Sequence, residues 1–166
     1  MPPPTDASRA EQVDRKIPVE RLELKTPSGK TWSFDAEIDD KVARNGADGV
    51  EIVAEVGSSL VFIDSYYSVP GAMSYCQAGH ERFLRVVTFG PPQPEEVLRL
   101  KLESCWQRIE LEEPVRWSAE TRTLHIDWLF GPLARDPPEE LTIHVGTTPT
   151  NLPGPSNAPV PHLEHR

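Results

Sequence analysis

The chain has 166 residues and a formal net charge of −9, with 17 Lys and Arg against 26 Asp and Glu. The basic residues are scattered singly among the acidic ones, which argues against a nucleic-acid partner and against an anionic membrane surface. No apolar run approaches the ~18 residues of a membrane-spanning helix, so we expect no insertion into a membrane.

The composition divides the chain into a domain and two tails. Residues 1–16 and 147–166 are polar and Pro-rich, which predicts flexible segments, and residues 17–146 predict one domain. A domain of this size folds without a metal or a dense disulfide framework, since such needs arise mainly below ~40 residues. Without a signal segment, the sequence read literally is cytoplasmic. The even number of cysteines and the Pro-rich start favour instead an exported protein, periplasmic or secreted, whose signal peptide has been replaced.

The domain begins with a predicted hairpin. In residues 19–25, Leu22 and Leu24 share one face and charged residues occupy the other. The Pro and Gly of residues 26–30 indicate a turn, and residues 32–38 alternate again. This pattern predicts two antiparallel strands with one face in water.

Residues 39–49 predict a loop, because they contain two Gly together with Asn and Asp. The carboxylates suggest calcium binding, but the acidic first position and the Glu at the twelfth position of an EF-hand loop are missing. We therefore interpret this stretch as a solvated turn, and we predict no metal site. Residues 50–56 predict the next strand.

Two later stretches, residues 60–63 and 83–89, are apolar on both faces, which indicates strands in the middle of a sheet. Residues 90–94 are Pro-rich and must form an outer connection. Further short strands are predicted at residues 98–106, 108–111, 115–117, 124–128 and 141–145. Eight or nine short strands, spaced by about 8 to 12 residues with no helical period, predict an all-β fold: a single antiparallel β-sandwich or a flattened barrel.

A loop rich in Tyr, Ser and Gly separates the two central strands. This composition is typical of recognition surfaces, because tyrosine offers a large contact area at low entropic cost. The alternative interpretation is that the tyrosines cap the end of the sandwich and Met73 plugs it. The candidate partner-binding residues are Tyr66, Tyr67, Ser68, Gly71, Met73, Ser74 and Tyr75.

The two cysteines are Cys76, in this loop, and Cys105, at the end of a predicted strand. A disulfide between them would close a loop of ~30 residues and stabilise the fold by ~3 to 4 kcal/mol. It would also pin the loop. The alternative is a pair of reduced, buried thiols in a cytoplasmic protein. Zinc binding has no support, because the sequence has no CxxC motif, and no cofactor is predicted.

Catalysis has little support in the sequence. Residues that could be drawn as a Ser-His-Asp triad lie close together in the chain, but no nucleophile elbow accompanies the serines. These residues are Asp64, Ser65, Ser74 and His80. We therefore predict no catalytic residues and a protein that is not an enzyme.

Tryptophans offer a second possible binding feature, a platform for sugars. Most of them fall within or beside apolar alternation, which favours packing in the core instead. The four are Trp32, Trp106, Trp117 and Trp128.

The run GAMSYCQAG at residues 71–79, which leads into ERFLRV at residues 81–86, resembles that of small exported bacterial β-proteins. The whole chain resembles periplasmic lysozyme inhibitors and the immunity proteins that share their sandwich, although Gly71 follows Pro70 where those proteins have Ser-Gly-x-Tyr. The resemblance implies that residues 68–75 enter the cleft of a peptidoglycan hydrolase.

We therefore expect a non-catalytic inhibitor or immunity protein with a protein partner. An acidic surface suits a basic partner, such as a lysozyme-like hydrolase, by electrostatic steering. The alternatives are a carbohydrate- or ligand-binding β-module and a cytosolic protein-interaction domain. The sequence makes no prediction of oligomeric state.

Overall fold

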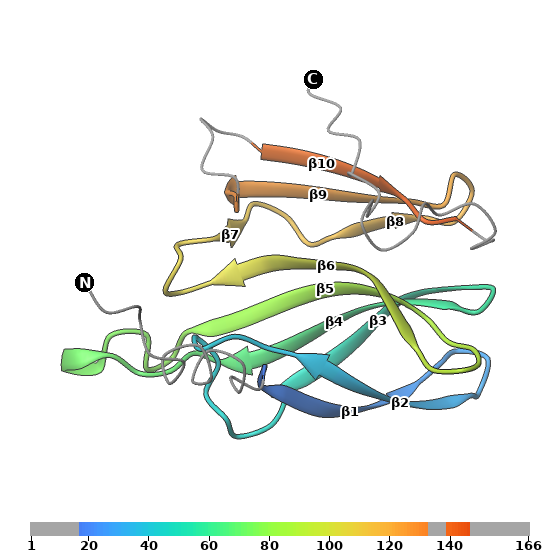
Figure 1. Cartoon of the computed structure of the whole chain (residues 1–166). Helices are drawn as coiled ribbons and strands as arrows, with labels where there is room; N and C mark the ends of the chain where they lie inside the picture. The colour runs from blue at the N-terminus through green and yellow to red at the C-terminus, as the bar shows by residue number, and fades with distance from the viewer. Residues whose placement is uncertain (1–16, 133–138, 147–166) are drawn as a thin grey trace, which may run out of the picture.

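A computed structural model of the chain describes residues 17–132 and 139–146, so the predicted tails lie outside the described residues. These residues form ten strands and one short 3-10 helix, η1 (Ala72–Ser74) (Figure 1). The strands are β1 (Val19–Lys25), β2 (Thr31–Glu37), β3 (Gly49–Val56), β4 (Ser59–Tyr67), β5 (His80–Thr88), β6 (Glu95–Ser104), β7 (Glu110–Leu111), β8 (Arg116–Ser118), β9 (Thr123–Phe130) and β10 (Glu139–His144). All pairings are antiparallel, so the predicted all-β fold is confirmed.

The central sheet has the strand order β3-β4-β5-β6. Its two middle strands, β4 and β5, are buried on both faces along most of their length, as their apolar sequences predict. The β3 strand forms one edge, where a bulge between Ile52 and Ala54 interrupts the register. Bulges at a sheet edge hinder pairing with other chains.

The central sheet lies between two other layers, the β1–β2 hairpin on one side and the β7–β10 sheet on the other (Figure 1). Each contact between layers has its own apolar core. The hairpin core consists of Leu22, Leu24, Phe34, Ala36, Leu60, Phe62, Val87 and Phe89. The opposite core includes Val61, Ile63, Leu84, Val86, Leu102, Leu124, Ile126 and Trp128. The central and β7–β10 sheets form the sandwich, and the hairpin adds a third layer that the sequence analysis did not predict.

Buried charges occupy the hairpin side of the central sheet, next to the apolar core. Arg85 pairs with Asp64, and its guanidinium also donates to the backbone oxygen of Glu37 at 2.8 Å and contacts Glu96 at 3.1 Å. Burial acts to lower the pKa of Arg85, but the hydrogen bonds and charge of Asp64 outweigh it and raise that pKa. These contacts tie the end of β2 to the sheet, and so fix where the following loop begins.

Candidate functional site

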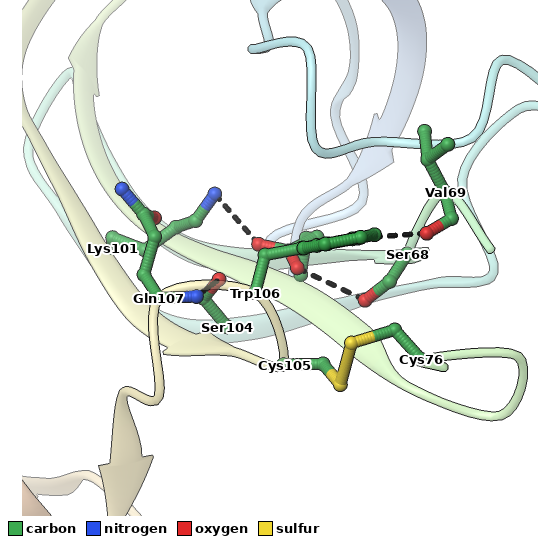
Figure 2. Close-up of a disulfide and its surroundings, with 9 residues drawn as sticks. Ser68, Val69, Cys76, Lys101, Ser104, Cys105, Trp106 and Gln107 are labelled. Atoms are coloured by element: carbon green, nitrogen blue, oxygen red, sulfur yellow. Dashed lines mark hydrogen bonds and ion pairs between the residues drawn. A yellow bond between two sulfur atoms is a disulfide. The ribbon is translucent and has the colours of Figure 1, made fainter. Parts of the chain in front are cut away.

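Residues 69–79, which make up most of the connection between β4 and β5, are held by a disulfide. Cys76 is bonded to Cys105, which follows the last residue of β6, and their Cα atoms lie 5.8 Å apart (Figure 2). The predicted disulfide is therefore present, and we call residues 69–79 the pinned loop.

A tryptophan holds the other side of the pinned loop. The indole nitrogen of Trp106 donates a hydrogen bond of 2.7 Å to the backbone oxygen of Val69 (Figure 2). Gly71 lies so close to this ring that a Cβ added there would come within 2.6 Å of an indole carbon. The ring of Tyr75 meets Trp106 edge-on, with centroids 5.2 Å apart. Gly71, predicted to bind a partner, thus serves at least to let the indole pack against the loop.

Buried polar groups support the base of the pinned loop. Ser68 donates a hydrogen bond of 2.9 Å to Glu81, which has no exposed surface. The ammonium of Lys101 lies 2.8 Å from the second oxygen of Glu81, at an angle outside hydrogen-bond geometry, and 2.6 Å from Asp39. In Figure 2 these contacts are the dashed lines that start from Ser68 and Lys101. The charge of Glu81 is therefore balanced by Lys101.

The tip of the pinned loop is strained and exposed. Met73, Ser74 and Cys76 have φ angles of 57°, 62° and 60°, in the left-handed region that residues other than glycine seldom adopt. The side chain of Met73 is fully exposed, with a relative accessibility of 101%. Strained backbone persists where the surrounding structure enforces it, and such positions cluster at functional sites.

The predicted partner-binding residues fall into two groups. Tyr67, Met73, Ser74 and Tyr75 are exposed. Tyr66 and Ser68 are buried, so their side chains are not exposed to a partner in the fold described here. Tyr66 lies on the same face of β4 as Phe62 and Asp64, and its hydroxyl donates a hydrogen bond of 2.6 Å to Asp64. Burial, together with the charge of Asp64, raises the pKa of Tyr66.

The exposed ring of Tyr67 belongs to a small polar cluster beside the loop. It packs against the ring of His80, with centroids 4.8 Å apart, and Nε2 of His80 lies 3.3 Å from a carboxylate oxygen of Asp48. A hydrogen bond to Asp48, with the charge of that carboxylate, raises the pKa of Tyr67. Sequence analysis missed Asp48 and Trp106 as neighbours of the loop, because both come from distant segments and no local pattern marks them.

The four residues considered for a Ser-His-Asp triad do not contact one another as a triad would, because three of them bind other partners. Asp64 is bound to Arg85, Ser65 accepts a hydrogen bond of 3.2 Å from Arg82, and His80 contacts Asp48. Ser74 lies on the exposed loop tip. The arrangement offers none of the Ser–His–Asp hydrogen bonds that a triad needs.

Comparison with known proteins yields no match to a protein-family model, a curated protein or a solved structure. Across residues 17–132 and 139–146, no helix is long and apolar enough to cross a membrane. In the same part of the chain, no group of three or more His, Cys, Asp or Glu side chains is placed to hold a metal ion.

Proposed function

We propose that the protein is a non-catalytic binding protein that places the tip of the pinned loop in a cleft of a protein partner. The observation that carries this proposal is the fully exposed side chain of Met73 on a strained backbone. An isolated apolar side chain in water gains free energy when a partner buries it. Methionine also adapts its shape to an irregular apolar surface.

The pinned loop is suited to binding because it is already ordered. The Cys76–Cys105 disulfide and the hydrogen bond from Trp106 to Val69 hold its two sides. A loop fixed in its bound shape loses less conformational entropy when it meets a partner, so more of the contact energy appears as affinity.

The chemistry of the loop limits what the partner's cleft can be. Residues 69–79 contain no Asp, Glu, Lys or Arg, although the whole chain carries a net charge of −9. The loop would therefore enter an uncharged or apolar part of a cleft and block it sterically. The acidic remainder of the surface would steer a basic protein toward it.

We propose a peptidoglycan hydrolase of the lysozyme type as the partner, and the periplasm or the extracellular space as the location. The resemblance of residues 71–79 and 81–86 to small exported bacterial β-proteins, and of the whole chain to periplasmic lysozyme inhibitors, favours this partner class. A disulfide that supports the loop fits an oxidising compartment. Inhibition of the hydrolase, in an inhibitor or immunity role, would follow from occlusion of its substrate cleft.

The test is an inhibition assay with basic lysozyme-type muramidases, read out as the clearing of a peptidoglycan suspension. Met73→Asp places a charge at the tip, and we expect inhibition at least about 30-fold weaker, the effect of losing a hot spot of ~2 kcal/mol. Ser58→Asp is the matched control, because Ser58 lies in the exposed turn before β4, at the opposite end of that strand from Tyr67. Equal loss in both variants, or full inhibition by Met73→Asp, would contradict the role of the tip.

A further inference from the structure

A groove of about 510 Å³ lies beside the pinned loop, where the end of β6 meets β7 and β9. Its lining includes His80, Glu103, Arg108, Glu110 and Phe130, together with Cys105 of the disulfide. In Figure 1 this is the side of the molecule where β6 turns into the β7–β10 layer. The volume falls within the ~300 to 1,000 Å³ of small-molecule sites.

The turn that carries Arg108 is built tightly. Ser104 and Ile109 exchange two backbone hydrogen bonds of 3.0 Å, and the amide of Gln107 donates to the Ser104 side chain at 3.0 Å. Within this turn Arg108 has a φ of 53°, a left-handed conformation that favours glycine. An arginine held in such a conformation is a candidate for a functional role.

The guanidinium of Arg108 has no ion pair with any described residue, although carboxylates exceed basic residues in the chain. Glu103, on the groove wall, is instead paired with Arg82 at 2.9 Å. The donors of Arg108 are therefore available to a ligand in the groove, and the charge of Glu103 is already balanced.

The same groove also has an apolar lining residue, Phe130. Phe130 is 55% exposed, and it is the register partner of Glu110 on the neighbouring strand. Register partners in an antiparallel pair project to the same face, so the phenyl ring and the Glu110 carboxylate lie side by side. An exposed aromatic ring next to convergent polar groups is typical of a ligand site.

We propose that this groove binds a neutral oligosaccharide. The positive charge of Arg108 and the negative charge of Glu110 cancel, which disfavours an anion or a cation as the ligand. A sugar has hydroxyl groups that accept from the planar donors of Arg108 and donate to the oxygens of Glu110. The apolar face of its ring would lie on Phe130. This site is separate from the tip of the pinned loop, so it does not depend on the function proposed above.

The test is an NMR titration of the ¹⁵N-labelled protein with cellotriose, maltotriose and tri-N-acetylchitotriose, each up to about 10 mM, where a Kd of ~1 mM approaches saturation. We expect one or more of these sugars to shift the amides of residues 104–110 and of Phe130. Phe130→Ala and Arg108→Ala should each weaken binding about tenfold. Leu129→Ala is the matched control, since Leu129 is also exposed but points to the other face of β9, and it should bind as the unmodified protein does.

Triglycine, a zwitterion of similar size, distinguishes the nearest competing ligand class. Shifts in the groove with triglycine and none with the three sugars would overturn the proposal in favour of a peptide-like ligand. No shift with any probe would also overturn it, as would sugar binding that persists unchanged in Phe130→Ala. Circular dichroism of each variant checks that the sheets remain folded.

Discussion

Asp64 and Arg85 are diagonal neighbours on the two central strands, and they form a hydrogen-bonded ion pair with no exposed surface. Arg85 donates to the two carboxylate oxygens of Asp64 at 2.7 and 2.9 Å. Tyr66 completes the carboxylate's contacts with a third hydrogen bond. A charge pair of this kind is costly to break, because the remaining partner is left charged and out of water.

We predict that Asp64→Asn and Arg85→Met will each lower the free energy of unfolding by about 3 to 5 kcal/mol, as measured by urea denaturation. The Arg21–Asp35 pair, at 3.0 Å between exposed side chains, provides the control. Asp35→Asn should cost less than about 1 kcal/mol. Similar losses of stability from Asp64→Asn and Asp35→Asn would contradict the prediction that the buried pair contributes more than the exposed one.

Stability should also fall at alkaline pH because of Tyr66. Its pKa is raised in the folded state, so above the ordinary tyrosine pKa of about 10 the unfolded chain loses a proton that the folded chain keeps. Tyr66 therefore makes its full contribution to the free energy of unfolding below about pH 10. Above that pH the contribution falls by about 1.4 kcal/mol per pH unit, the value for one titrating group.

The measurement is the free energy of unfolding at pH 8 and at pH 10.5 for the unmodified chain, Tyr66→Phe and Tyr75→Phe. Tyr66→Phe should lose less stability between the two values than the unmodified chain, because it has no hydroxyl to titrate. Tyr75→Phe changes a tyrosine that is 46% exposed and should follow the unmodified chain. Parallel curves for all three proteins would contradict the prediction.

The disulfide should resist alkylation until it is reduced. Intact-mass measurement after denaturation is expected to show no label on Cys76 or Cys105 without reductant, and two labels with it. Replacing both cysteines by Ser should lower stability by ~3 to 4 kcal/mol, because the bridge spans 29 residues. Reductant should then have no effect on that variant. Labelling of both thiols in the unfolded protein without reductant would refute the bridge.

We predict that a larger residue in place of Gly79, at the end of the pinned loop, destabilises the fold. A Cβ at this position would come within 2.6 Å of the Cβ of Cys105 and 3.0 Å of its sulfur. Because the disulfide cannot move aside, Gly79→Ala should cost about 1 to 3 kcal/mol. Gly90→Ala is the control, since nothing lies within 4 Å of its added Cβ. Thermal melts compare the two, and equal melting temperatures would mean that the loop adjusts freely.

Much of the fold was predictable, because strand patterns are local. The apolar residues 60–63 and 83–89 indicate strands covered on both faces, and β4 and β5 are the middle strands of the central sheet. Boundaries were less predictable. Residues 108–111 were expected to form one strand, but β7 begins at Glu110, since Arg108 lies in the tight turn after β6.

The site was predictable in part. The composition of the loop after β4 predicted that it is a binding surface. For the cysteines the sequence allowed two interpretations, a disulfide or two free thiols. Which one holds depends on whether β6 ends beside that loop. Tyr66 was named as a candidate partner-binding residue, although alternation along β4 puts it on the face of Phe62 and Asp64. The hairpin layer buries this face at Phe62, whereas Tyr66 packs with Ile38, Val42 and Phe83. No local pattern shows which layer a face will meet.

By itself, therefore, the sequence determined the strands, the turns and the composition of the loop, because these depend on residues that are neighbours in the chain. The tertiary structure decided which loop side chains reach solvent, that Trp106 packs on Gly71, and that Arg108 and Phe130 line one groove. These relationships join segments 20 or more residues apart, 35 for Gly71 and Trp106 and 22 for Arg108 and Phe130. They exist because packing of the layers, rather than local propensity, brings such segments together.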